Sequence, residues 1–93
     1  MRRVERRLFR LNEDIERLRR GVEVTEGELN MHRHLADDAA RDAAVSEGLE
    51  RAESRMANKD VAALERALER TRRDLDRAEA KRLDLLRRLD ASR

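Results

Sequence analysis

Two histidines near the middle of the chain are the side chains best suited to metal or acid–base chemistry. His32 and His34 are the only histidines, and Asp37 and Asp38 follow them closely. Imidazoles two residues apart on a helix point to different sides, so they cannot chelate one metal ion as histidines at i and i+4 do. Because no spacing matches a zinc or di-iron signature, we expect no metal and no cofactor.

Catalysis requires combinations of residues that this sequence does not contain. The 93 residues include no cysteine, no glycine-rich loop for a phosphate group and no nucleophile paired with a base. Carboxylates are abundant, but a carboxylate on an exposed helix surface is a poor general acid at neutral pH. We therefore expect a protein without enzymatic activity.

Arginine is concentrated at both ends of the chain, where it could neutralise phosphate groups. Against nucleic-acid binding, acids interleave with bases along the rest of the chain, and Phe9 is the only aromatic residue available for base stacking. No helix-turn-helix or zinc-finger pattern is present. Binding of nucleic acid by this basic end is therefore our alternative hypothesis. The candidate phosphate contacts are Arg2, Arg3, Arg6, Arg7, Arg10, Arg87 and Arg88.

The middle of the chain is acidic. Residues 21–60 carry ten acids and five bases, whereas residues 1–20 carry eight arginines and four acids. An acidic turn between two helices is similar in architecture, though in no motif, to the coiled-coil hairpins that carry acidic tips into the RNA polymerase channel. The alternative hypothesis is a protein that binds nucleic acid or the transcription machinery through the arginine-rich end.

Apolar residues in the first half of the chain recur at alternating steps of four and three. This heptad spacing places them on one stripe of an α-helix, which is typical of a coiled-coil interface. Thr25 and Ala36 continue the stripe, and His32 on it is interpreted as a packing or register residue. After the turn, helical spacing resumes at Leu49, Ala52 and Met56. It continues through Val61, Leu64, Leu68, Thr71, Leu75, Ala78 and Arg82. The predicted interface residues are Val4, Leu8, Leu11, Ile15, Leu18, Val22, Leu29, His32, Leu64, Leu68, Leu75, Leu86 and Leu89.

The reversal between the two stripes is predicted at Ser46-Glu47-Gly48, because glycine enters the left-handed conformation that ends helices. This turn at about 46–48 leaves helices at about 2–45 and 49–91. An alternative layout extends the loop to residue 60, with Asn58 or Asp60 capping the second helix. The predicted fold is all-α, with residues 1–93 forming one antiparallel coiled-coil hairpin domain.

The second helix has a less regular pattern than the first. Leu64, Leu75 and Leu86 are eleven residues apart, and that spacing predicts a straighter, less supercoiled segment. Leucines at positions 83, 85, 86 and 89 cover more of the circumference than one partner helix can bury. We therefore predict that two copies form a four-helix bundle, with Phe9, Leu83 and Leu85 as contacts for a partner.

Charge is expected to orient such a dimer. Charged residues make up 47% of the chain, against roughly 25% in an average domain. The hairpin places a basic end opposite an acidic turn, so two copies attract best head to tail. Elsewhere, acid–base pairs spaced i, i+4 are expected to form a solvated helix face. These pairs are Glu13–Arg17, Glu16–Arg20, Glu69–Arg73 and Asp84–Arg88.

The sequence thus predicts a small structural or adaptor protein that works through helix–helix association with itself or with a larger protein. Binding to an anionic membrane through Phe9 and its apolar neighbours is opposed by the acids between residues 13 and 16. The sequence contains no apolar run of membrane-spanning length and no secretory signal pattern. The expected location is the cytoplasm.

Overall fold

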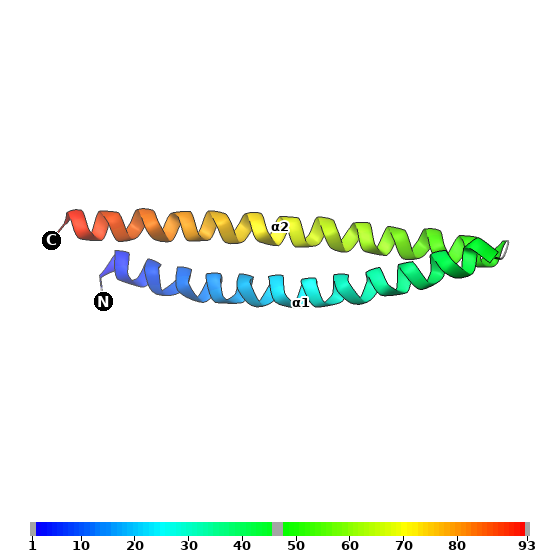
Figure 1. Cartoon of the computed structure of the whole chain (residues 1–93). Coiled ribbons are helices and arrows are strands. Elements are labelled where there is room, and N and C mark those ends of the chain that lie inside the picture. Colours follow the sequence, from blue (N-terminus) through cyan, green and yellow to red (C-terminus); the bar gives the residue numbers. More distant parts are fainter. Residues whose placement is uncertain (1, 46–47, 93) are drawn as a thin grey trace. The chain divides into compact units, whose positions relative to one another are not determined.

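The computed structural model describes residues 2–45 and 48–92, and these residues form two long helices packed against each other (Figure 1). The first helix, α1, spans Arg3–Val45, and the second, α2, spans Leu49–Ala91. No strand is present in either described range. The chain is therefore an all-α helical hairpin, as the sequence predicts. Residues 49–60, where the alternative layout placed a loop, are helical.

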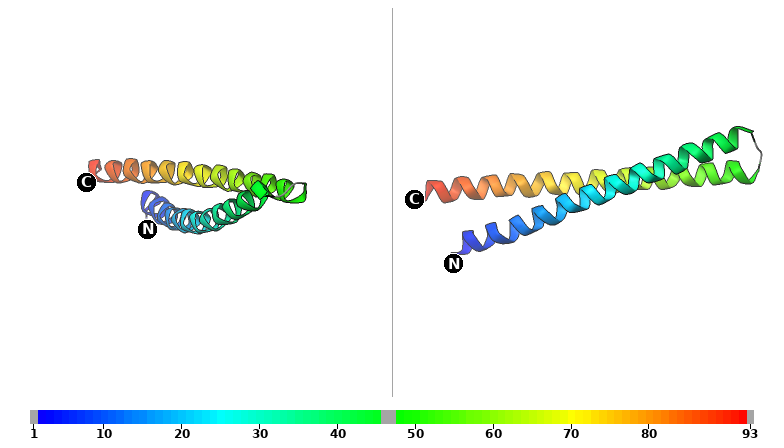
Figure 2. Two further views of the ribbon diagram at one scale, coloured as in Figure 1. Left: turned by 45° about the vertical axis from the view of Figure 1, so that its right-hand side comes forward. Right: turned by 60° about the horizontal axis from the view of Figure 1, so that its bottom comes forward.

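Contacts within the chain group it into two compact units, each built from one piece of α1 and one piece of α2. The terminal unit comprises Met1–Val22 and Arg70–Arg93, and the turn unit comprises Glu23–Glu69. In the terminal unit, the blue part of α1 runs beside the orange and red part of α2, with opposite chain directions (Figure 2). In the turn unit, the green parts of both helices lie side by side.

Burial along α1 follows the predicted heptad spacing and extends it. Ile15 is only 1% exposed, and we count it as heptad position a. The other a and d residues of α1 are also buried or half-buried, because they face α2. The series is Val4, Leu8, Leu11, Ile15, Leu18, Val22, Thr25, Leu29, His32, Ala36, Ala39 and Ala43.

Burial along α2 keeps the seven-residue period to the end of the helix. When Leu64 is assigned to heptad position d, every residue of α2 at positions a and d is buried or half-buried. Leu85, at position d, is 4% exposed, whereas Leu86 is 43% exposed. The eleven-residue series through Leu86 therefore does not describe the helix interface. The buried series is Glu50, Ser54, Ala57, Val61, Leu64, Leu68, Thr71, Leu75, Ala78, Arg82, Leu85 and Leu89.

Gly48 has the backbone conformation that the turn prediction requires. Its φ of 79° lies in the left-handed region, which a residue with a Cβ atom enters only at a cost. The Gly48 carbonyl then accepts a hydrogen bond from the Ala52 N–H at 3.1 Å, at the start of α2. Ser46 and Glu47, the first two residues of the predicted turn, lie outside the described residues.

Small side chains form much of the interface in the turn unit. Ala36 is buried, and Ala39, Ala43 and Ala57 are half-buried. Each of these residues buries little apolar surface, so this part of the interface contributes little hydrophobic stabilisation. Neither helix, over its described length, contains a stretch long and apolar enough to cross a membrane.

Candidate functional site

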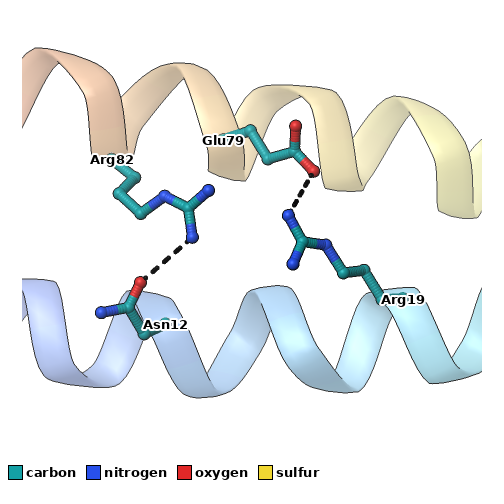
Figure 3. A network of polar contacts seen from close by, with 4 residues as sticks. All are labelled: Asn12, Arg19, Glu79 and Arg82. Carbon is teal, nitrogen blue, oxygen red and sulfur yellow. Dashed lines mark hydrogen bonds and ion pairs between the residues drawn. The ribbon is translucent and has the colours of Figure 1, made fainter.

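The heptad positions beside the interface define two outer surfaces of each unit. In the terminal unit, Arg19 and Glu79, both at position e, form an ion pair at 3.4 Å. Arg82 donates a hydrogen bond to Asn12, also at position e, at 3.3 Å on the same side (Figure 3). We call the surface formed by positions e and b the e/b flank.

The opposite surface is formed by positions c and g of both helices, and we call it the c/g flank. In the terminal unit, open grooves on this side are lined by interface leucines and by residues at g. Leu11 and Leu85 line one groove together with Asp14 and Lys81, which are both at position g. Arg17 and Arg77, both at position c, line the next groove. In this antiparallel pair, residues at position g of one helix therefore lie across from residues at position g of the other. Residues at position e likewise lie across from residues at position e. In the turn unit the described residues at positions a and d are also buried or half-buried between the helices. Its residues at c and g, and those at e and b, can therefore be assigned to the two flanks in the same way.

The c/g flank of the terminal unit is strongly basic. Its three acids each form an ion pair within the flank: Asp14 with Arg17 at 2.9 Å, Asp84 with Arg88 at 3.0 Å, and Asp74 with Arg77. The expected partner of Arg17 was Glu13, so the structure replaces an i, i+4 pair by an i, i+3 pair. Eight bases against three acids give the flank a net charge of +5. The bases are Arg3, Arg7, Arg10, Arg17, Arg70, Arg77, Lys81 and Arg88.

The c/g flank of the turn unit combines exposed apolar side chains with acids. All the large apolar side chains that are exposed among the described residues of this unit lie at c or g. The same positions hold five acids and no base, for a net charge of −5. The apolar residues are Val24, Met31, Leu35, Val45, Leu49 and Met56. The acids are Glu28, Asp38, Asp42, Glu53 and Asp60, of which Asp38 pairs with Arg41.

The e/b flank differs from the c/g flank in both units. In the turn unit its positions hold no valine, isoleucine, leucine, methionine or phenylalanine, and five acids face three bases. In the terminal unit it carries Phe9, Leu83 and Leu86, which are 59%, 50% and 43% exposed. Phe9 lies one turn before Asn12, and Leu86 lies one turn after Arg82, so Phe9 and Leu86 lie at a similar level of the antiparallel pair. We call these three residues the Phe9 patch.

The structure places most of the predicted interface residues between the helices and exposes two of the three predicted partner contacts. Twelve of the thirteen residues predicted for the interface are buried or half-buried between the helices, and Leu86 is the exception. Leu85, predicted as a partner contact, is instead buried in the interface. The two leucines exchange roles because Leu85 follows Arg82 at the heptad step of three. Phe9 and Leu83 are exposed.

The predicted phosphate contacts are all exposed but do not share one face. Arg3, Arg7, Arg10 and Arg88 lie on the c/g flank, where Arg88 is paired with Asp84. Arg6 and Arg87, at position f, point away from the interface, and Arg2 lies at position b. The structure therefore gathers four of the seven arginines on the flank that is basic in the terminal unit.

The two histidines are separated, as their spacing predicts. His32 lies half-buried at position d, and His34 is exposed at position f. Within residues 2–45 and 48–92, no group of three or more histidine, cysteine or acidic side chains is placed to hold a metal ion.

The apolar side chains of the turn-unit flank were not identified from the sequence. A signal for them exists, because Val24, Glu28, Met31 and Leu35 begin a second series with steps of four and three. Acids interrupt this series, and in α2 only Leu49 and Met56 correspond to it. This series can be recognised as an exposed flank only when it is known which residues of the two helices face each other.

None of the protein families, curated proteins or solved structures compared with this chain matches it.

Proposed function

We propose that this protein is a non-enzymatic structural or adaptor protein of the cytoplasm that acts through helix–helix association, with itself or with a larger protein. The observation that carries this proposal is the position of the exposed apolar residues. Among the described residues, nine large apolar side chains are exposed, and they fall into two groups: the c/g flank of the turn unit and the Phe9 patch. Exposed apolar groups of this kind mark protein interaction surfaces.

The limited core of the single chain supports association. Only seven hydrophobic residues among the described part of the chain are buried, and two of these are alanines. A domain below about 100 residues hides a small share of its surface and is correspondingly marginal. Two further helices from a second copy would cover more apolar surface and give a four-helix bundle.

Sedimentation equilibrium of the full chain tests the proposal. The monomer has a mass of 10.9 kDa, and we expect the weight-average mass to approach twice this value at micromolar concentrations and low ionic strength. A chain that stays fully helical and monomeric to several hundred micromolar would rule out self-association as its mode of action.

Nucleic-acid or transcription-machinery binding is the second candidate function, and the charge of the terminal unit favours it. That unit holds 17 bases and 9 acids, for a net charge of +8, which would attract phosphate groups. Gel shifts with mixed DNA and RNA at physiological salt separate the two functions. An adaptor gives no shift, whereas a nucleic-acid binder gives a shift that disappears as salt is raised and after Arg3, Arg7 and Arg10 are changed to glutamine.

A further inference from the structure

We propose that the c/g flank of the turn unit binds the c/g flank of the terminal unit in a second copy of this chain. This inference rests on the proposed function and specifies its surfaces. Each chain carries both flanks, so the partner needs no surface that the structure does not contain.

Charge complementarity identifies the second copy as the occupant. The turn-unit flank carries a net charge of −5 and the terminal-unit flank carries +5. Two turn-unit flanks facing each other would place five acids against five acids, and like charges across an interface oppose docking. The head-to-tail arrangement instead brings Glu28, Asp42 and Glu53 to a surface rich in arginine.

The apolar side chains fit the same partner. Arginine and lysine side chains have long aliphatic stems that cover apolar surface while their charged groups reach neighbouring acids. Arg7, Arg10 and Lys81 can therefore cover Met31 and Leu35 and still meet the carboxylates beside them. Methionine adapts its shape to an irregular neighbour, and arginine and methionine are both enriched at protein interfaces.

The e/b flanks do not offer this match. In the turn unit the e/b flank lacks large apolar side chains, and its charges nearly balance. In the terminal unit, among the described residues, its bases Arg2, Arg19 and Arg72 are outnumbered by five acids. The e/b flank of the turn unit therefore provides a matched surface for control substitutions on the same helices.

Two charge-reversed variants and their mixture test the pairing. The turn variant, Glu28→Lys/Asp42→Lys/Glu53→Lys, changes its flank from −5 to +1. The terminal variant, Arg7→Glu/Arg10→Glu/Lys81→Glu, changes its flank from +5 to −1. Each variant alone places like charges across the interface, so we expect its association to weaken at least tenfold. In an equimolar mixture, both pairs of flanks regain opposite charge, so we expect mixed complexes to form at the native concentration range.

A control variant changes three acids on the other flank. Glu23→Lys/Asp37→Lys/Glu65→Lys alters the total charge by the same amount as the turn variant, but on the e/b flank. We expect this control to keep the native mass distribution in sedimentation, and circular dichroism verifies that every variant remains helical. A milder variant, Glu28→Gln/Asp42→Asn/Glu53→Gln, removes charge without reversing it and should weaken association by a smaller factor.

The outcomes distinguish this inference from the proposed function. If the native chain is monomeric, self-association and the flank pairing both fail. If the native chain associates but either reversed variant associates equally well, the flank pairing is wrong while self-association stands. Failure of the mixture to form complexes, with both variants folded, also contradicts the pairing.

Discussion

Gly48 is the residue whose backbone most restricts substitution. Its positive φ of 79° costs a residue with a side chain roughly 1–2 kcal/mol. We therefore expect Gly48→Ala to lower the free energy of unfolding by about 1–2 kcal/mol. Urea denaturation at fixed protein concentration measures the effect, because association also changes apparent stability. An unchanged denaturation midpoint would show that this conformation is not required.

At Gly27, substitution by alanine should have the opposite effect on the free energy of unfolding. It lies within α1, and a Cβ atom built on it meets no other atom within 4 Å. Alanine is favoured over glycine in a helix interior by roughly 1 kcal/mol, so Gly27→Ala should raise the free energy of unfolding by about that amount. At Gly21 the added Cβ would make ordinary contact with Thr71 Cγ2 at 3.6 Å, so Gly21→Ala should also stabilise. A loss of stability at Gly27 would contradict its exposed position.

At the scale of the helices, adjacent leucines in α2 test the assignment of the interface. Leu85 is buried at position d, and Leu86 is exposed at position e. Removing a buried leucine side chain costs about 2–5 kcal/mol, whereas an exposed substitution usually changes stability by less than about 0.5 kcal/mol. We expect thermal unfolding to show a large loss for Leu85→Ala and a small one for Leu86→Ala. The reverse order would support the eleven-residue pattern instead.

The fold of α1 could be predicted from the sequence because its pattern has a single interpretation. From Val4 to Ala36 every step is four or three, and each of these residues is buried or half-buried. The position of the turn could be predicted for a related reason, because Gly48 is the glycine that lies between the two apolar stripes. Ala39 and Ala43 extend the interface, but alanine is also a common helix former, so the sequence alone leaves their role open.

The end of α2 could not be assigned in the same way. Leu83, Leu85, Leu86 and Leu89 offer several apolar stripes, and a charged residue, Arg82, occupies the interface position before them. The half-buried Arg82, which ends the series predicted from Val61, keeps its guanidinium near Asn12, and a polar residue at that position does not indicate which of the following leucines continues the heptad. The leucines alone therefore favoured Leu86 over Leu85.

For the whole molecule, the sequence predicts the charge difference but not the surface that carries it. The turn unit holds 12 acids and 6 bases, for a net charge of −6, against +8 in the terminal unit. Counting charges along the chain detects this difference. Assigning it to the c/g flank requires the heptad phase of both helices, and beyond Arg82 the phase of α2 became clear only from burial at Leu85.

Salt should weaken association of the whole protein. The Debye length falls from about 10 Å at 0.1 M salt to about 3 Å at 1 M, which screens attraction between the −5 and +5 flanks. We expect the dissociation constant, measured by sedimentation, to rise about tenfold or more between 0.05 and 0.5 M sodium chloride. Association that strengthens with salt would indicate an interface governed by apolar contact alone.

The antiparallel pairing of α1 with α2 within one chain is the claim on which the flanks depend, and a distance measurement tests it most directly. The sequence has no cysteine, so spin labels can be attached through Arg19→Cys and Glu79→Cys, at the e positions that face each other in Figure 3. Packed helix axes lie about 8–10 Å apart, so we expect one population with a separation on the order of 10–20 Å. The short distance should persist in a tenfold excess of unlabelled protein. A separation near 90 Å, expected for one continuous helix at about 1.5 Å per residue, or a short distance lost on dilution with unlabelled chains, would contradict the hairpin.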